Sequence, residues 1–181
     1  SARRGTFGYG DGFSAGDCSV QDWGAQHAAV LLDVRAGQRV LDACAAPGGK
    51  TAHLLECCDG LELLALDADA TRARRIAENL VRLHLSATVK AVDCRQVVAW
   101  WDGRPFDRIL ADVPCSASGV VRRHPDAKWL RRVADVSGFA ATQAGILDAL
   151  WPLLAPGGKM LCCTCSVFPE ENGEQVAAFV A

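Results

Sequence analysis

Short apolar runs alternate with segments of helical periodicity along most of the chain. The apolar runs predict strands at residues 39–43, 62–66, 87–92, 107–111 and 159–163. Apolar residues recur at helical spacing in residues 20–34, 72–85, 96–101 and 139–153, and helices are also expected after the glycines at 48–49 and from residue 169 to the end. This alternation implies right-handed crossovers and therefore predicts an α/β fold with a doubly wound, mostly parallel, Rossmann-like sheet.

Residues 1–16 depart from this pattern, because they hold five glycines and few large apolar side chains. They predict an irregular arm or linker remnant, which leaves 17–181 as one α/β domain. The chain has 181 residues, half of them apolar, so one domain with a substantial core is expected.

Net charge, apolar stretches and cysteine content limit which binding partners and which cellular compartment are expected for the chain. The net charge of −2 gives no general basic signature, so a nucleic-acid contact would need a local patch. No uncharged apolar stretch reaches about eighteen residues and no signal peptide opens the chain, which predicts a cytoplasmic protein without membrane contact. Nine cysteines are present. The neighbours Cys57–Cys58 and Cys162–Cys163 suit buried apolar positions. One pair of cysteines, Cys162 and Cys165, has Cys-x-x-Cys spacing, and because there is no second pair at zinc spacing we expect no metal site.

Residues 40–51, with the sequence VLDACAAPGGKT, form the most informative stretch. They predict a strand, a turn of small residues and the first turn of a helix. Such a turn lets a ligand approach bare backbone N–H groups, and the helix dipole favours an anionic group there. An ordinary tight turn would explain Gly48 and Gly49, but it would not require four small residues followed by Pro-Gly-Gly-Lys-Thr.

Two ligand classes compete for this loop. A phosphate-binding P-loop would need glycine at Cys44, and Pro47 removes one N–H donor from a phosphate cradle. The other class is the nucleoside-type site for S-adenosyl-L-methionine (S-adenosylmethionine), in which an acidic residue after the next strand takes the ribose hydroxyls. Asp67 occupies that place about twenty residues further on, which favours the second class.

Unusual polar residues follow the expected strands at their carboxyl ends, where open parallel sheets bind ligands. A single aspartate there is more often a helix cap or a solvated turn. Together these strand-end residues are stronger evidence for a ligand site than any one of them alone. They are the loop at 44–51, Asp67, Asp93, Asp112, Cys115 and Cys165.

Cys115 and Cys165 are expected on adjacent strands of one face. A thiolate that adds to carbon-6 of cytosine makes carbon-5 nucleophilic enough to attack a methyl sulfonium, and an acid at Asp112 would assist by hydrogen-bonding to the ring nitrogen. Two packed core cysteines are the alternative interpretation. Residue spacing does not decide which cysteine would be the nucleophile.

A basic segment follows this region and interleaves an aromatic residue with cations. Such a pattern suits phosphate contacts and base stacking, although a solvated charged surface explains it equally well. The candidate RNA-binding residues are Arg122, Arg123, His124, Lys128 and Trp129. A ring carbon within folded RNA would be reached only after the base is unstacked or flipped.

Three motifs together resemble the RNA 5-methylcytosine methyltransferases, namely DACAAPGGKT at 42–51, DVPCSASG at 112–119 and TCSVFPEEN at 164–172. Residues 119–129, GVVRRHPDAKW, resemble the bacterial RsmB (Fmu/Sun) group, which methylates a cytosine of small-subunit (16S) ribosomal RNA. The resemblance implies a class I S-adenosylmethionine-dependent methyltransferase fold and makes 17–181 the catalytic core. It covers the chain from about residue 12 to its end.

The resemblance also implies residue roles. It makes Cys165 the nucleophile and Cys115 the residue that assists release of the product. It assigns cofactor binding to Cys44, Ala45, Ala46, Pro47, Gly48, Gly49, Lys50, Asp67, Asp93 and Asp112. Cys94 and Val113 depart from the residues usual in the family, Gly and Ala, without removing a functional group.

The resemblance further implies an N-terminal RNA-binding domain and two more C-terminal strands, so we expect a catalytic-domain fragment truncated after strand five and its following helix. The edge of that strand would then be open to pairing, which predicts self-association. Two other functions remain as alternatives. One is a P-loop-like nucleotide hydrolase that uses Lys50, Thr51 and Asp112, and the other is a non-catalytic RNA-binding scaffold.

Overall fold

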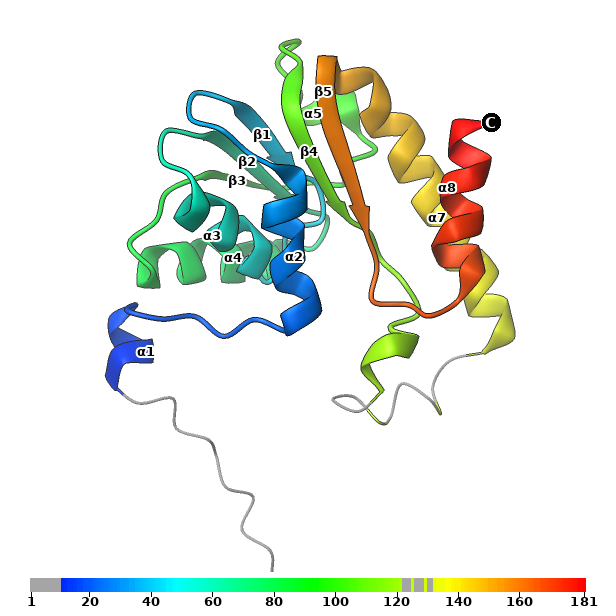
Figure 1. Cartoon of the computed structure of the whole chain (residues 1–181), viewed down its shortest axis with the longest axis horizontal. Helices are drawn as coiled ribbons and strands as arrows, with labels where there is room; N and C mark the ends of the chain where they lie inside the picture. The colour runs from blue at the N-terminus through cyan, green and yellow to red at the C-terminus, as the bar shows by residue number, and fades with distance from the viewer. Residues whose placement is uncertain (1–10, 122–124, 126–128, 130–131) are drawn as a thin grey trace, which may run out of the picture.

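A parallel five-stranded sheet, in the order β3-β2-β1-β4-β5, forms the centre of the computed structural model (Figure 1). The structure describes residues 11–121, 125, 129 and 132–181. The strands are β1 (Arg39–Asp42), β2 (Glu62–Asp67), β3 (Thr88–Ala91), β4 (Phe106–Asp112) and β5 (Leu154–Cys163). This confirms the doubly wound α/β fold, and each of these strands lies within a few residues of its predicted position.

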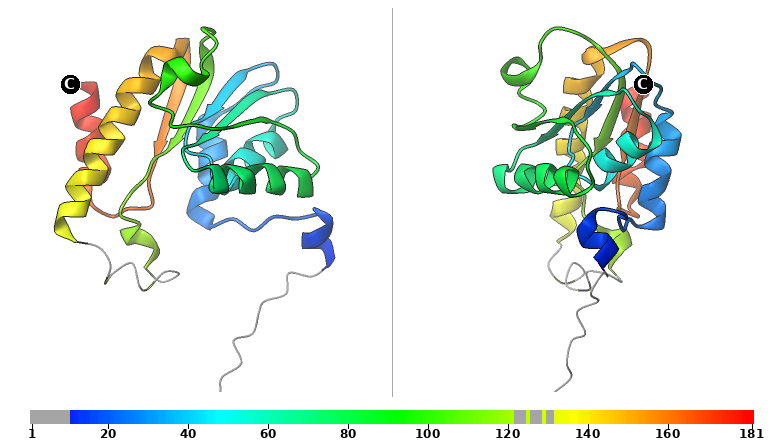
Figure 2. Two further views of the ribbon diagram at one scale, coloured as in Figure 1. Left: turned by 180° about the vertical axis from the view of Figure 1, so that it is seen from behind. Right: turned by 90° about the vertical axis from the view of Figure 1, so that its left-hand side faces the viewer.

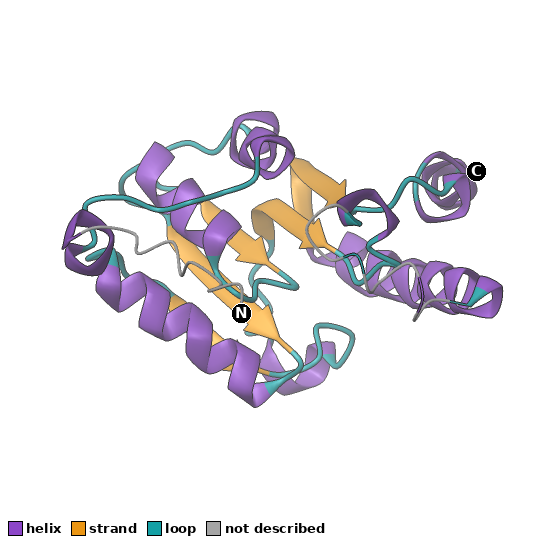
Figure 3. Ribbon diagram, turned by 90° about the horizontal axis from the view of Figure 1, so that it is seen from below, coloured by secondary structure: helices purple, strands orange, loops and turns teal. Residues whose placement is uncertain are grey.

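Helices cover both faces of the sheet (Figure 3). Residues of α2, α3 and α4 pack with one face, whereas residues of α5 and α7 pack with the other, and α8 lies against α7 (Figure 2). The α-helices are α1 (Asp11–Ala15), α2 (Trp23–Leu32), α3 (Gly49–Cys57), α4 (Ala70–Arg82), α5 (Val97–Trp100), α7 (Val133–Leu150) and α8 (Gly173–Val180). Short 3-10 turns, η1 (Ser118–Val120), η2 (Trp151–Leu153) and η3 (Pro169–Glu171), complete the described elements.

Alternation along the central strands divides the core between the two faces. In β1, Val40 packs with the α2–α4 side while Leu41 packs with the α5–α7 side. In β4, Leu110 faces the first cluster and Ile109 the second, and all four side chains are fully buried. Successive side chains of a strand point to opposite faces, so a sheet covered on both faces gives nearly continuous apolar runs.

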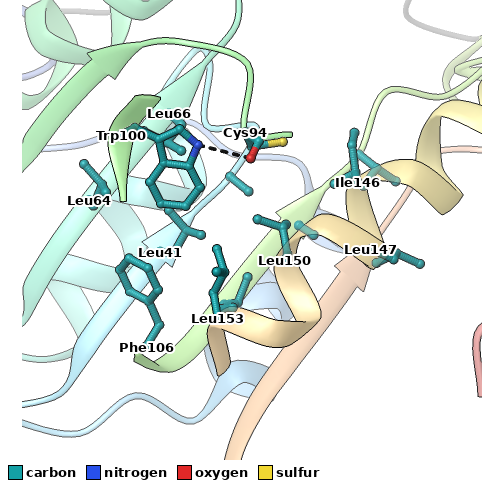
Figure 4. Close-up of a cluster of buried hydrophobic side chains, with 14 residues drawn as sticks. Leu41, Leu64, Leu66, Cys94, Trp100, Phe106, Ile146, Leu147, Leu150 and Leu153 are labelled. Carbon is teal, nitrogen blue, oxygen red and sulfur yellow. Dashed lines mark hydrogen bonds between the residues drawn. The ribbon is translucent and has the colours of Figure 1, made fainter. Parts of the chain in front are cut away.

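Two aromatic rings anchor the cluster on the α5–α7 side (Figure 4). The ring centroids of Trp100 and Phe106 are 6.2 Å apart, and the indole N–H of Trp100 donates to the backbone oxygen of Cys94 at 3.1 Å. Leu147 and Leu150 of α7 close the cluster. The bond to Cys94 fixes the turn after β3.

Helix α4 follows its sequence pattern closely. Asp69 caps it by accepting the backbone N–H of Arg72 at 2.9 Å, and Ile76, Leu80 and Leu83 are buried as expected. The cap satisfies one of the backbone donors that the first turn of a helix leaves without an intrahelical partner.

Strand β5 begins earlier than predicted. The Pro-Gly-Gly sequence at 156–158, expected to be a break before the strand, instead forms an irregularity within it, where the register with β4 shifts. A side chain at Gly158 would meet the backbone oxygens of Ala155 and Asp107 at 2.8 and 3.0 Å. Glycine therefore lets the chain bulge and rejoin the sheet at Lys159.

Three further expectations differ from the structure. Residues 11–15 form α1 within the predicted irregular arm, and their position is fixed by Arg82, whose guanidinium donates to the backbone oxygen of Phe13 at 2.7 Å. Helix α7 starts six residues before the predicted position, because Asp135 accepts the backbone N–H of Arg132 at 2.9 Å and stabilises an earlier first turn. None of the four cysteines expected at buried positions is fully buried: Cys57, at the last turn of α3, is exposed, and Cys58, Cys162 and Cys163 are partly exposed. Every helix in the described ranges is too short or too polar to cross a membrane.

Candidate active site

The loop between β1 and α3 is shaped by its glycine and by bonds to the neighbouring strand. Gly48 has φ +98°, and a Cβ there would meet the Cα of Ile76 at 3.2 Å. The backbone N–H of Ala45 donates to Leu66 at 2.8 Å, and that of Gly48 donates back to Ala45 at 2.7 Å. The loop thus lies close to the end of β2, with α3 beginning directly after it.

Asp67 lies beside this loop, as predicted. Its carboxylate accepts the backbone N–H of Ala46 at 3.3 Å and that of Asp69 at 3.0 Å, and Arg72 forms an ion pair with it at 3.3 Å. The acidic side chain at the end of β2 is therefore held against the loop after β1 by its own hydrogen bonds.

Asp42, at the end of β1, is a buried carboxyl group that the sequence analysis assigned no role. One oxygen accepts the hydroxyl of Thr51 at 2.7 Å, and the other has no hydrogen-bond partner in the described part of the chain. Burial raises its pKa to about 7, an effect that the bond from Thr51 partly offsets. The group links the strand to the first turn of α3, beneath the loop.

Lys50 and Asp112 form an ion pair across the site, with 2.6 Å between Nζ and the carboxylate. Burial alone would lower the pKa of Lys50, but the carboxylate of Asp112 outweighs it and the pKa is raised. The pair joins α3 to the end of β4 and holds a positive charge near the strand ends.

The two candidate catalytic cysteines lie together, with 3.4 Å between the sulfur atoms of Cys115 and Cys165. The pKa of Cys115 falls to about 6, chiefly because the Cys165 thiol donates to its thiolate, with further bonds from the backbone N–H groups of Ala117 and Cys165. The same hydrogen bond raises the pKa of Cys165. The first proton to leave this pair therefore leaves a negative charge on Cys115, with Cys165 as the thiol donor.

Cys94, where the resemblance led us to expect glycine, lies beside the loop as the hydrogen-bond partner of Cys44. That bond, together with burial, raises the pKa of Cys44, which therefore stays a neutral thiol. Asp93 turns to Arg95, whose guanidinium binds it at 2.6 Å and lowers its pKa. Asp93 does not line the pocket that contains the two cysteines.

One pocket of about 260 Å³ brings most of these groups together. Its walls come from the loop after β1 and from the carboxyl ends of β2, β4 and β5, and the segments after β4 and β5 run side by side toward the bottom of Figure 1. The residues that line it include Cys44, Ala46, Asp67, Arg72, Asp112, Cys115 and Cys165. Pro47 and Gly49 face a separate cavity that also includes Arg75 and Arg82. The described residues contain no group of three or more His, Cys, Asp or Glu side chains placed to hold a metal.

A buried polar cluster behind the cysteines was missed by the sequence analysis. Its centre is Glu171, which accepts hydrogen bonds from Ser116, Ser166 and Gln143. The one signal for it was the presence of Glu171 within the third motif, since its position at a helix start equally predicts an exposed residue.

The basic segment lies mostly outside the described residues, including Arg122, Arg123, His124 and Lys128. Trp129 is described, and 81% of its surface is exposed. An exposed indole is compatible with base stacking, and the RNA-binding role of this segment stays a prediction.

Comparisons with known proteins give a consistent family. A model of the 16S rRNA methyltransferase RsmB/F family matches residues 29–181. The chain is 54% identical over 171 residues to ribosomal RNA small subunit methyltransferase B of Pseudomonas putida KT2440, which covers 94% of this chain and 39% of the relative. The corresponding protein of Vibrio cholerae is 53% identical over 169 residues, covering 93% and 39%. The chain thus spans about two fifths of the length of these relatives.

Solved structures of other proteins share the fold of this chain. The crystal structure of NSun6 from Pyrococcus horikoshii with SFG superposes with a TM-score of 0.86 at 28% identity, covering 94% of this chain and 44% of that one. A methyltransferase homologue from Pyrococcus horikoshii gives a TM-score of 0.82 at 30% identity, covering 94% and 53%. The match extends over the whole sheet, so the strand ends that carry the site are those of a shared fold.

Proposed function

The chain belongs to the RsmB/F family of 16S rRNA methyltransferases, and we propose that it methylates carbon-5 of a cytosine in small-subunit rRNA through a covalent cysteine adduct, with S-adenosylmethionine as the methyl donor. The observation that carries the proposal is the pair of sulfur atoms 3.4 Å apart within a pocket that also includes Cys44 and Asp67. Neither a P-loop hydrolase nor an RNA-binding scaffold has a use for such a pair.

The residues around the pocket fit S-adenosylmethionine. We assign the ribose hydroxyls to Asp67 and the approach of the cofactor to the turn from Cys44 to Lys50, of which Cys44 and Ala46 line the same pocket as Asp67. Asp112 lines the same pocket and completes the site, whereas Asp93 would contribute from outside its wall. When bound, the cofactor supplies an electrophilic methyl group on a sulfonium sulfur.

The division of roles between the two cysteines rests on the family resemblance, because the lowered pKa of Cys115 alone would favour Cys115 as the nucleophile. For Cys165 to act, its proton must pass to Cys115 over the 3.4 Å between the two sulfur atoms. The Cys165 thiolate then adds to carbon-6 of the ring. After carbon-5 has gained the methyl group, a base must remove its remaining proton before Cys165 leaves; Cys115, 3.4 Å from Cys165, would do so once it has released to solvent the proton it took from Cys165.

In this proposal Asp112, which lines the pocket, acts on the ring nitrogen of the pyrimidine, and Lys50 acts through its ion pair with Asp112. Addition at carbon-6 builds negative charge toward the ring nitrogen, which must gain a proton or a hydrogen bond. Asp112 bears the group proposed to bond to that nitrogen. Because a carboxylate only accepts hydrogen bonds, the proton for this bond must be supplied to it, and Lys50, whose Nζ donates to Asp112 at 2.6 Å, carries such protons. The target base must leave its stack to enter the pocket, and Trp129 and the basic segment would contact the flanking RNA.

Cofactor binding is tested by titrating the protein with S-adenosylmethionine in a calorimeter, with ATP and magnesium in parallel. We expect heat of binding from S-adenosylmethionine alone. Binding of ATP alone would contradict the proposal and support the P-loop alternative, while RNA binding with neither nucleotide would support the scaffold.

The cysteine roles are tested with Cys165→Ser and Cys115→Ser variants incubated with small-subunit rRNA and S-adenosylmethionine. We expect the first variant to lose both methylation and covalent adduct, and the second to accumulate adduct because release is blocked. The reverse pattern would overturn the assignment. Cys18→Ser, which changes an exposed cysteine remote from the pair in sequence, is the matched control.

The edge of β5 motivates a second proposal, self-association of this chain. Within the described sheet β5 pairs with β4 on one side only, so a row of backbone groups on its other side is available to a second copy. Light scattering across a concentration series should show growth beyond the monomer mass, and a constant monomer mass would exclude self-association.

We further propose that residues 17–181 act as the catalytic core and, because the substrate is ribosomal RNA, that the protein works in the cytoplasm.

A further inference from the structure

Glu171, in η3, is almost fully buried, with 1% of its surface exposed, although it is a charged residue type. One oxygen accepts the backbone N–H of Ser116 at 2.8 Å and the side-chain amide of Gln143 at 3.3 Å. The other accepts the Ser116 hydroxyl at 2.5 Å and the hydroxyl of Ser166. Four donors thus converge on one carboxylate.

This convergence requires a group that only accepts hydrogen bonds. A carboxylate offers two oxygens and no donor, whereas the amide of glutamine would present an N–H₂ group to one pair of these donors. Each serine hydroxyl has one proton, and the short bonds to Glu171 take those of Ser116 and Ser166. The hydroxyl of Ser118, 3.1 Å from that of Ser166, can then donate to it. The cluster is therefore matched to a carboxylate at its centre.

The serines bound by Glu171 directly follow the two cysteines of the site. Ser116 comes after Cys115 at the end of β4, and Ser166 comes after Cys165 at the end of β5. The two segments are 50 residues apart in the chain, yet they share one acceptor. The position of each sulfur relative to the other therefore depends on bonds to the same buried group.

Further hydrogen bonds join the two segments and restrict their movement relative to each other. The backbone N–H of Gly119 donates to the oxygen of Cys165 at 2.9 Å, and that of Val167 donates to the hydroxyl of Ser118 at 2.9 Å. From α7, Gln143 also donates to the oxygen of Pro114 at 3.0 Å. Hydrogen bonds thus fix the two segments against each other, and the side chains of Cys115 and Cys165 line the pocket.

We propose that Glu171 is a positioning residue that holds Cys115 and Cys165 in register, so that one sulfur can hydrogen-bond to the other. The catalytic consequence rests on the proposed function, but the positioning itself concerns only this chain's thiols. Glu170, the neighbouring glutamate, is exposed and belongs to none of these bonds, so it gives a matched comparison.

The test is the pH profile of thiol alkylation in Glu171→Gln, Glu170→Gln and the unchanged protein. Iodoacetamide is the probe, and mass spectrometry of peptides reports Cys115 separately, with exposed Cys18 as an internal reference. The groups that face Cys115 are the thiol and backbone of Cys165, the backbone of Ala117 and, at longer range, the charge of Glu171.

A positioning role and a purely electrostatic role of Glu171 predict opposite shifts in the pH midpoint of Cys115 alkylation in Glu171→Gln. The charge of Glu171 alone raises the pKa of Cys115, so its removal would move the alkylation midpoint to lower pH. Loss of positioning separates Cys115 from its hydrogen-bond donors and moves the midpoint up, toward the value of about 8.5 of a free thiol. We expect the upward shift, with Glu170→Gln unchanged. A downward or absent shift in a folded Glu171→Gln protein would overturn the proposal.

Ser118→Ala supplies a second test if Glu171→Gln does not fold. It removes the hydroxyl that accepts the Val167 backbone N–H and leaves the carboxylate in place. A smaller upward shift is expected, and an unchanged midpoint would count against the proposal. Because alkylation needs neither RNA nor cofactor, a shift without methylation would support the positioning role while contradicting the proposed function.

Discussion

Replacing Asp42 with asparagine is expected to make the protein less sensitive to pH between about 4 and 7. Asp42 is fully buried, and its only described bond is the 2.7 Å contact with the hydroxyl of Thr51. Burial raises its pKa from 3.8 to about 7 in the folded protein. Asparagine keeps the size of the side chain and an oxygen for Thr51, but it does not titrate.

The sign and size of the effect follow from this pKa. Between pH 3.8 and about 7 the unfolded chain ionises while folded Asp42 keeps its proton, so the folded state binds more protons and the free energy of unfolding falls as pH rises. The difference of about 3 pKa units corresponds to about 4 kcal/mol of cost at pH 7 and above, at ~1.4 kcal/mol per unit. The cost is absent below the unfolded pKa.

The assay is urea unfolding at pH 5, 6, 7 and 8, followed by tryptophan fluorescence, to which the buried Trp100 contributes together with the four other tryptophans. The difference in free energy of unfolding, Asp42→Asn minus unchanged, should rise in favour of asparagine by about 2 kcal/mol between pH 5 and 7 and level off by pH 8. The new amide N–H₂ group, left without an acceptor, costs about 1–3 kcal/mol at every pH, so the slope rather than the offset carries the test.

Asp93→Asn is the control, because the pKa of Asp93 is lowered by its bonds to Arg95. Its contribution to stability is present above the unfolded pKa of 3.8 and is lost only as pH falls below that, so its difference should stay flat from pH 5 to 8. An equally flat difference for Asp42→Asn would refute the argument that burial holds this carboxyl protonated.

Two further predictions use matched pairs of variants in the same urea assay. Gly119→Ala places a Cβ 2.7 Å from the backbone oxygen of Cys165 and should lower the free energy of unfolding by about 1–3 kcal/mol. Gly138→Ala, in open space on α7, should instead raise it by up to about 1 kcal/mol. Equal effects of the two substitutions would contradict the close contact at Gly119. Lys50→Gln removes the cation of a half-buried ion pair and should cost about 1–2 kcal/mol, whereas Arg95→Gln at a more exposed pair should cost less than about 1 kcal/mol. Equal losses from the two ion-pair variants would show that burial does not separate them.

Two positions outside the pocket show where the sequence patterns predicted the structure least well. Cys57 was expected to be buried because its neighbours are apolar, but helical position decided its exposure. The break expected at Gly158 became a bulge within β5, because the partner strand offers a place to resume pairing after the irregularity. Such outcomes depend on what lies opposite a residue, which local sequence does not contain.

The sequence by itself determined the order of strands and helices, the loop that follows β1 and the motifs that identify the family. These features are local: period-two and period-3.6 patterns, turn residues and short motifs each lie within a few residues of one another. It also placed Asp67, Asp112, Cys115 and Cys165 at strand ends, since the edge of a parallel sheet follows from its connectivity.

Only the tertiary structure decided which of these groups touch. It brought the sulfur atoms of Cys115 and Cys165 to 3.4 Å, paired Lys50 with Asp112 and buried Glu171 among donors from three separate segments. These contacts join residues that are tens of positions apart, and their geometry is set by sheet register and helix packing together. The charge carried by each thiol follows from those contacts, and for that reason it could not be read from the chain alone.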